Sequence, residues 1–315
     1  MAKGSRKVIF AALAGNTLIA VTKFAAAAVT GSSAMLSEGI HSLVDTGNQI
    51  LLLHGMRRAS RPPDRRFPFG HGREIYFWSF VVAILIFAGG AGFSIYEGLV
   101  HLRHPEPLRN PAVNYVVLGL AVLFEGGAWW FAVREFSRSK GPAGYVRAVQ
   151  RGKDPTLFVV LFEDSAALLG LLVALLGVLL AQLTGNVLYD GMASIAIGGI
   201  LAATAVWLAY ETKGLLIGES ASPEVVEGIR ALAARHPEVE HVNEVLTMHL
   251  GPEDILVNLS LDFRDDVPAG RLETVIAAID REIREAWPEV RRVFVEAEAR
   301  RAQEGSGAAE VPPSG

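Results

Sequence analysis

Residues 37–49 read SEGIHSLVDTGNQ and lie between two apolar runs, AAAAVTGSSAML and ILLLHG. On a helix, Glu38, His41 and Asp45 fall at positions i, i+3 and i+7 and share one face. A charged side chain at the centre of a bilayer costs roughly 2.5–3.5 kcal/mol on insertion scales. Three ionisable groups on one face of an apolar helix therefore indicate a partner that offsets this cost.

The composition indicates a membrane protein with a soluble part. Hydrophobic residues make up 51% of the 315 residues, and the mean hydropathy is +0.33, which is too apolar for an ordinary soluble protein. The net charge of -4 gives no indication of a nucleic-acid partner. The chain has no cysteine, which excludes disulfides and thiolate metal sites. Any metal ion must therefore be held by imidazole and carboxylate groups.

Six apolar segments are long enough to cross a bilayer, which takes about 20 residues. These predicted spans lie near residues 8–30, 34–56, 75–100, 112–134, 156–183 and 188–210, and we interpret the first as a retained span rather than a signal peptide. The turns TGSS and TGN are very short, so the spans that each one joins are antiparallel neighbours. Small residues in AGGAGFS and GMASIAIGG predict close packing between the helices.

Lysine and arginine gather on one side of these spans, while the opposite side has only Arg103 and Arg109, in the loop after the third span. The positive-inside rule therefore predicts that both termini are cytoplasmic. The basic residues on the cytoplasmic side are Lys3, Arg6, Lys7, Arg57, Arg58, Arg61, Arg65, Arg66, Arg73, Arg134, Arg138, Lys140, Arg147, Arg151, Lys153 and Lys213.

The composition changes after the sixth span, and the sequence predicts a transmembrane domain (1–212), a cytoplasmic domain (213–300) and a disordered tail (301–315). Residues 222–236 predict a helix that begins near Pro223, HVNEVLTMHL predicts a strand and GPED a turn. ILVNLSLDF alternates apolar and polar residues as a half-buried strand does. Residues 269–287 predict an amphipathic helix and RRVFVEAE a last strand. The order αββαβ indicates a small α+β domain.

Nine ionisable residues inside the predicted spans count as costly to place in a membrane. Glu97, Glu125 and Asp190 fit a role in pairing helices or reaching the headgroups, and Lys23 fits neutralisation of a carboxylate across the bundle. The nine residues are Lys23, Glu38, His41, Asp45, Glu97, Glu125, Glu163, Asp164 and Asp190.

His41 and Asp45 are one helical turn apart, about 6 Å of rise, so both side chains can reach one ion. An imidazole and a carboxylate together suit zinc. If the second and fifth spans touch, Asp164 supplies a third corner of a tetrahedron, and Glu163 or water supplies the fourth. The alternative is a purely structural polar network. Glu38 is a candidate for guiding the ion or a proton along the exit path.

The motif HSLVD, within GSSAMLSEGIHSLVDTGNQ, together with FPFGHGREIYFW, resembles the cation diffusion facilitator family, and VVLFEDSAALLG resembles the branch that includes the animal mitochondrial zinc transporter. The resemblance covers nearly the whole chain and implies six spans followed by a metallochaperone-like domain. It carries His41, Asp45 and Asp164 over as metal ligands. The family's further ligand of the fifth span is replaced here by Val160, so Glu163 or water must complete the site.

The resemblance also bears on the loop after the second span and on the cytoplasmic domain. A second metal site in the loop is expected to be absent or weak, because Phe67 stands where some members have histidine beside Asp64 and His71; a hydrogen-bonding role at the next helix start is the alternative for His71. The resemblance further implies a homodimer and a charge lock between Arg73 and Glu219. The domain, with His236, His241 and His249 as its only histidines, is expected to serve dimerisation rather than to hold a metal cluster.

The function implied is export of a divalent cation, Zn²⁺ first and Mn²⁺, Fe²⁺ or Co²⁺ as alternatives, in exchange for protons. The chain is expected to be a transporter without a cofactor, not an enzyme, in a bacterial inner membrane. Two other classes remain open. One is a metal-binding scaffold of the same fold that does not transport, and the other is an intramembrane hydrolase with His41 as base and a metal-activated water.

Overall fold

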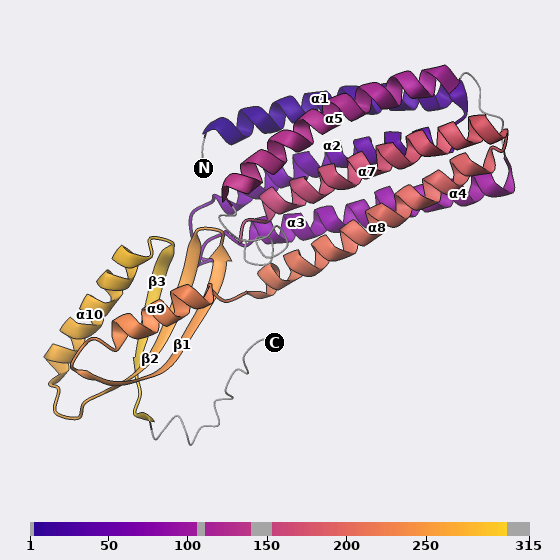
Figure 1. Cartoon of the computed structure of the whole chain (residues 1–315). Coiled ribbons are helices and arrows are strands. Elements are labelled where there is room, and N and C mark those ends of the chain that lie inside the picture. Colours follow the sequence, from indigo (N-terminus) through magenta and orange to yellow (C-terminus); the bar gives the residue numbers. More distant parts are fainter. Residues whose placement is uncertain (1–2, 106–110, 140–152, 301–315) are drawn as a thin grey trace. The chain divides into compact units, whose positions relative to one another are not determined.

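The computed structural model describes residues 3–105, 111–139 and 153–300 (Figure 1). The chain divides into two compact units, Met1–Gly214 and Leu215–Gly315. The predicted disordered tail and part of the predicted basic loop after the fourth span lie outside the described residues.

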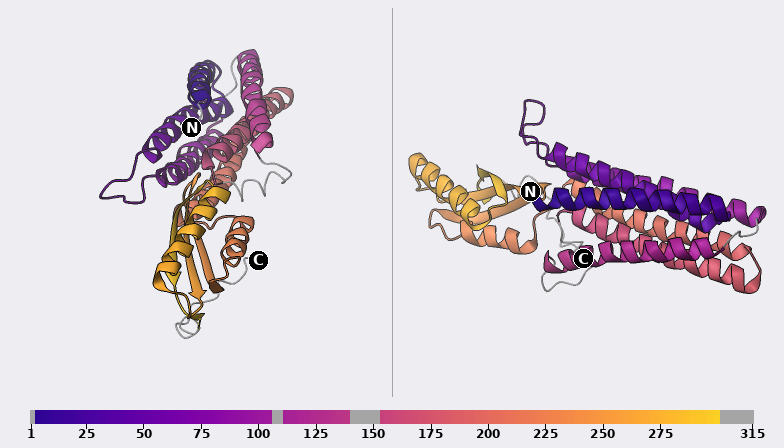
Figure 2. Two further views of the ribbon diagram at one scale, coloured as in Figure 1. Left: turned by 90° about the vertical axis from the view of Figure 1, so that its left-hand side faces the viewer. Right: turned by 90° about the horizontal axis from the view of Figure 1, so that it is seen from above.

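The first unit consists of six long helical rods, one for each predicted span. The third rod is continuous through α3, a π-helical segment η1, and α4, and the six rods run side by side in the views of Figure 2. Their bounds are α1 (Lys3–Thr30), α2 (Ser33–Ala59), α3 (Glu74–Leu85), η1 (Ile86–Gly92), α4 (Phe93–Arg103), α5 (Pro111–Ser139), α7 (Pro155–Thr184) and α8 (Leu188–Ile217).

Four stretches of the described residues are long and apolar enough to cross a membrane on their own: Glu74–Arg103, Ala112–Arg134, Phe158–Thr184 and Leu188–Ile217. The first rod contributes a shorter apolar helix, Asn16–Thr30. The second rod, α2, is long enough but not apolar enough, because one of its faces carries buried polar side chains, among them Glu38, His41 and Asp45. Its membrane position therefore depends on partners from the other rods.

Tight turns set the two antiparallel pairs. Gly31 has φ 69° between α1 and α2, a left-handed conformation that glycine adopts without steric cost. Ser32 then caps α2, its Oγ accepting from the backbone N–H of Met35 at 3.1 Å. Gly185, with φ 66°, ends α7 in the same way before α8 begins.

Packing within this unit centres on α2 and α7. The helices α1, α2, α5 and α7 contact one another in the pairs α1–α2, α1–α5, α2–α7 and α5–α7, while α3, η1 and α4 pack against α2. The prediction of close packing through small residues is confirmed between α4 and α8. A Cβ atom on Gly98 would lie 2.7 Å from the carbonyl oxygen of Gly191, and one on Gly198 would lie 2.5 Å from Cγ1 of Ile95.

The second unit is a three-stranded sheet with two helices. Its elements are α9 (Pro223–Ala233), β1 (Val239–Gly251), β2 (Asp254–Phe263), α10 (Ala269–Ala286) and β3 (Val290–Ala297). The sheet order is β1-β2-β3, with β1 antiparallel and β3 parallel to β2. Val257 of β2, Ile229 of α9 and Ile279 of α10 are fully buried in one shared core. The αββαβ order and the predicted fold class, a multi-pass helical membrane protein with a small α+β domain, are confirmed.

Candidate functional site

The polar face of α2 is buried inside the bundle. His41 and Asp45 lie one turn apart, with Nδ1 of His41 3.3 Å from Oδ1 of Asp45. Within the described part of the chain, neither ring nitrogen of His41 has a hydrogen-bond partner, and Oδ1 of Asp45 has none either. Buried polar atoms are almost always paired in proteins, so this cluster of unpaired donors and acceptors calls for a specific explanation.

Glu163 of α7 faces this part of α2. Its side chain is buried, and its Oε1 accepts a hydrogen bond of 2.7 Å from Nδ2 of Asn48. The carboxyl groups of Asp45 and Glu163 are close enough to interact electrostatically. The packing of α7 against α2 thus joins the two helices through Asp45, Asn48 and Glu163.

Asp164 is partly buried and lies about 100° further around α7 than Glu163. Its charge interacts with those of Glu163 and Glu125. Among the described residues, no group of three or more histidine and acidic side chains is gathered closely enough to hold an ion. The structure brings together His41 with Asp45 and Asp45 with Glu163, while the set that uses Asp164 as the third corner stays a prediction.

Asn48 was not among the residues that the sequence pattern indicated. It is fully buried, and its Nδ2 donates to Glu163, while its Oδ1 has no partner in the part of the chain that the structure describes. Its position, seven residues after His41 and three after Asp45, places it on the same helix face. That spacing is the signal that could have identified it.

Lys23 of α1 is fully buried, and its ammonium group is surrounded by oxygen atoms. Nζ donates to Oε2 of Glu38 at 3.0 Å, to Oγ of Ser42 at 2.9 Å and to Oε1 of Glu125 at 2.9 Å. The prediction that Lys23 neutralises a carboxylate across the bundle is confirmed, and it contacts two. Glu125, predicted as a group that pairs helices or reaches the headgroups, pairs helices by joining α5 to α1.

Asp190 of α8 also pairs helices. Its side chain is fully buried and accepts from Oγ of Ser32 at 2.7 Å, from the backbone N–H of Ser33 at 2.6 Å and from that of Ala34 at 3.3 Å. Nε2 of His101 lies 3.9 Å from Oδ2 of Asp190. This carboxylate therefore holds the first turn of α2 beside the first turn of α8.

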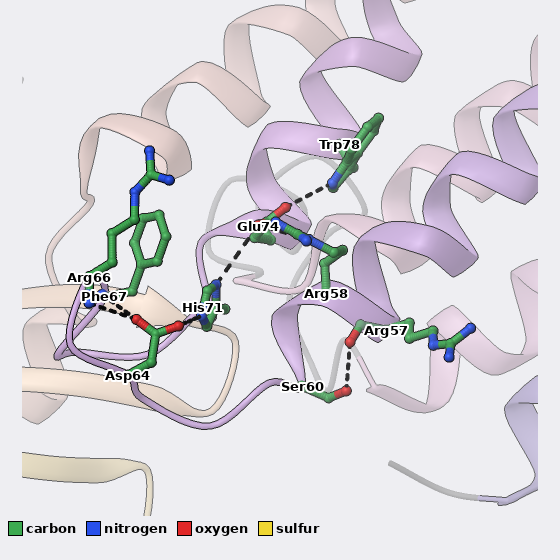
Figure 3. Close-up of polar contacts among 9 residues, drawn as sticks. All are labelled: Arg57, Arg58, Ser60, Asp64, Arg66, Phe67, His71, Glu74 and Trp78. Atoms are coloured by element: carbon green, nitrogen blue, oxygen red, sulfur yellow. Dashed lines mark hydrogen bonds and ion pairs between the residues drawn. The ribbon is translucent and has the colours of Figure 1, made fainter.

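The loop after α2 contains a separate polar cluster (Figure 3). Nε2 of His71 lies 3.0 Å from Oδ2 of Asp64, and the backbone carbonyl of His71 accepts from the N–H of Glu74 at 2.9 Å. Glu74 in turn accepts from Nη2 of Arg58 at 2.7 Å and from Nε1 of Trp78 at 3.0 Å. These contacts support the interpretation of His71 as a hydrogen-bonding residue at the start of the third rod.

Arg73 immediately precedes α3, and Glu219 follows α8. The backbone carbonyl of Glu219 accepts from the N–H of His249 at 2.9 Å within the second unit. The two residues belong to different units, and their predicted charge lock stays a prediction.

Comparison with known proteins places this geometry in context. A family model described as the cation efflux transmembrane domain matches residues 9–217. The chain is 36% identical over 264 residues to "Proton-coupled zinc antiporter SLC30A9, mitochondrial" of Homo sapiens, which covers 83% of this chain and 46% of that protein. The chain thus spans about half the length of these zinc antiporters.

Two further relatives are more distant. The chain is 29% identical over 261 residues to "Metal tolerance protein C4" of Arabidopsis thaliana, covering 82% of this chain and 57% of the relative. It is 25% identical over 302 residues to "Manganese efflux system protein MneP" of Bacillus subtilis, covering 92% and 95%.

Proposed function

Because the chain belongs to the cation efflux family, the cation diffusion facilitators, we propose that it is a secondary transporter that exports a divalent cation from the cytoplasm in exchange for protons. Zn²⁺ is the first candidate for the cargo, because the chain is 36% identical to proteins named as proton-coupled zinc antiporters. The transporter works without a cofactor and is not an enzyme.

The observation that carries the proposal is the buried, unpaired polar face between α2 and α7. Both nitrogens of His41, Oδ1 of Asp45 and Oδ1 of Asn48 lack hydrogen-bond partners among the described residues. An arriving cation would give the imidazole and carboxylate atoms of this set a partner and would offset the negative charge of Asp45 and Glu163 at once. We assign His41, Asp45, Asp164 and Glu163 as candidate ligands that the arriving ion draws together, and Asn48 as the residue that orients Glu163.

Proton exchange follows from the chemistry of these ligands. Histidine binds a metal ion only when it is neutral, and carboxylates bind it when they are ionised, so loading the site releases protons. Exposure of the site to a more acidic outer face returns protons to these groups and expels the cation. Alternating access then requires one group of helices to move against another around the site, with Glu38 guiding the ion or proton on the way out.

The ligand set is richer in oxygen than in nitrogen. Oxygen ligands tolerate manganese, iron and cobalt better than a histidine-rich site does. The 25% identity to a manganese efflux protein keeps Mn²⁺ as the second candidate for the cargo.

We further propose that both termini are cytoplasmic, that the protein resides in a bacterial inner membrane, and that it works as a homodimer through its α+β domain. The charge pattern of the loops supports the orientation. Arg73 and Glu219 then form a lock between the membrane part and the cytoplasmic part of each chain.

The test is flux of Zn²⁺ into vesicles that contain the purified protein, under an imposed pH gradient. We expect Asp45→Ala and Glu163→Gln to abolish zinc flux, and Asn48→Ala to reduce it by about 10–100-fold because the orientation of Glu163 is lost. Glu97→Gln removes a carboxylate from α4, away from the site, and serves as the matched control. Flux that survives Asp45→Ala and Glu163→Gln at the level of the control variant would contradict the assignment.

A metal-binding scaffold that does not transport is the remaining candidate from the same fold. It predicts binding of Zn²⁺ that depends on Asp45, without any flux at any pH gradient. Measuring zinc binding by calorimetry on the same preparations separates this outcome from a protein that neither binds nor transports.

A further inference from the structure

The cluster around Lys23 contains more negative than positive charge. A lysine ammonium has three N–H donors, and here all three have acceptors: Glu38, Ser42 and Glu125. One ammonium thus serves two carboxylates in a part of the bundle where Lys23 and Glu38 are fully buried and Glu125 is mostly buried. With both carboxylates ionised, the cluster carries one uncompensated negative charge, which is costly in a low-dielectric interior.

Each of the two carboxyl groups has one oxygen available to carry a proton. Oε2 of Glu38 and Oε1 of Glu125 accept from Lys23. Oε1 of Glu38 and Oε2 of Glu125 are buried and have no hydrogen-bond partner among the residues that the structure describes. A proton on either unpaired oxygen brings the cluster to neutrality and leaves the contacts to Lys23 intact.

The helices around the cluster supply mainly acidic groups. The third rod, which packs against α2, carries its charged groups away from the middle of the bundle, in its first turn or its last two turns. The facing groups are Glu38, His41 and Asp45 on α2, Glu125 on α5, and Glu163 and Asp164 on α7. The groups on the third rod are Glu74, Glu97, His101 and Arg103.

The free oxygen of Glu38 lies at the contact between α2 and α7. A Cβ atom on Gly170 of α7 would come within 2.5 Å of Oε1 of Glu38. The absence of a side chain at residue 170 therefore leaves the space that the carboxyl group of Glu38 occupies. The same two helices carry His41, Asp45 and Glu163. The proton-accepting oxygen and the candidate cation ligands are therefore carried by one pair of helices. On α2, Glu38 precedes His41 by three residues.

We propose that Glu38 and Glu125 hold one exchangeable proton beside Lys23, forming a proton site separate from the cation ligands. The inference rests on the proposed exchange of a cation for protons. A proton from the outer side binds one carboxylate and neutralises the cluster. A divalent cation that arrives at His41, Asp45 and Glu163 adds positive charge next to this cluster, and the proton leaves to the cytoplasm as H⁺. Lys23 sets the number of bound protons at one, because it compensates one of the two carboxylates.

The experiment is infrared difference spectroscopy on the purified full chain, which detects the C=O stretch of a protonated carboxylic acid directly. We expect such a band in the metal-free protein at neutral pH, loss of the band in Glu38→Gln or Glu125→Gln, and its retention in Glu97→Gln. Lys23→Met should strengthen the band, because neither carboxylate then has a counter-charge and both become protonated. A structural salt bridge with both carboxylates ionised predicts no band that depends on Glu38 or Glu125, and this result would overturn the proposal.

A second variant provides a test if the charge-removing variants fold poorly. Gly170→Ala leaves every charged residue in place but displaces Oε1 of Glu38, and we expect it to shift the frequency of the band. An unchanged spectrum in Gly170→Ala, combined with a band that persists in Glu125→Gln, counts against the site. The infrared result stands whether or not the wild-type protein moves Zn²⁺ in vesicles. A protein that shows the band but no flux thus refutes the proposed exchange and leaves the proton site established.

Discussion

At the scale of single residues, Asp64 shows how one carboxylate organises a loop. It accepts from the backbone N–H groups of Arg66 and Phe67, both at 2.8 Å, and contacts the ring of His71. The N–H of Phe67, the ring of His71 and the N–H of Arg66 hold the pKa of Asp64 below its ordinary value. These contacts favour the ionised form of the carboxyl group.

The lowered pKa leads to a prediction about acid stability. A carboxyl group whose pKa is lower in the folded state stabilises the fold above its unfolded pKa, about 3.9, and loses that contribution as the pH falls through the folded value. We expect Asp64→Asn to lower the melting temperature at neutral pH, and the difference from wild type to shrink as the pH falls below about 4. Thermal unfolding of the detergent-solubilised protein over a pH series measures this.

Asp265→Asn is the control for that series, because Asp265 is an exposed carboxylate in the loop before α10. It should leave the melting temperature unchanged across the same range. If the melting temperatures of wild type and Asp64→Asn differ by the same amount at every pH, the charge of the carboxyl group does not stabilise the loop.

The residues of the candidate site were predictable to different degrees. His41 and Asp45 could be found because a charged face within an apolar segment is visible in the sequence. Which of Glu163 and Asp164 faces α2 depends on the rotation of α7, and this is set by packing. Ser165, for example, accepts from Nε1 of Trp129 on α5 at 2.9 Å. No local pattern in VVLFEDSAALLG encodes that contact.

At the scale of helices, the start of α2 depends on a residue from α8. The backbone N–H groups of Ser33 and Ala34 belong to the first turn, where a helix has no acceptors of its own. Asp190 supplies the acceptor for both. We expect Asp190→Ala to destabilise the protein by about 1–3 kcal/mol, because these buried donors lose their partner.

The measurement is denaturant or thermal unfolding of the full chain in detergent, with Asp190→Asn as the matched variant. The asparagine keeps one acceptor oxygen and should lose less stability than the alanine. Equal losses in the two variants would indicate that the negative charge, rather than the capping geometry, is what matters.

The helices themselves were largely predictable, because a run of about 20 apolar residues has few alternatives to spanning a membrane. The π-helical segment η1 was not predicted. It coincides with the glycine- and alanine-rich run of the third rod, where a Cβ on Gly89 would lie 3.2 Å from Cγ2 of Val44 on α2. The small residues were visible in the sequence, but the wider turn depends on how the third rod fits against α2.

At the scale of the whole molecule, the proposed charge lock between Arg73 and Glu219 gives the sharpest test of communication between the two units. We expect Arg73→Glu and Glu219→Arg each to reduce zinc flux, and the double variant with exchanged charges to recover it. A plain surface pair contributes only about 0–1 kcal/mol, so recovery of flux rather than of stability is the informative quantity. Additive losses in the double variant would show that the two residues act independently.

The contacts of α2 also determine how this chain is built into a membrane during synthesis. Glu38 meets its counter-charge on Lys23, which is 15 residues earlier in the chain, whereas Asn48 meets Glu163 only 115 residues later. The first two helices therefore already contain the counter-charge of Glu38 when they pair. The side of α2 that carries His41 and Asp45 gains its contact with Glu163 only after α7 has been synthesised.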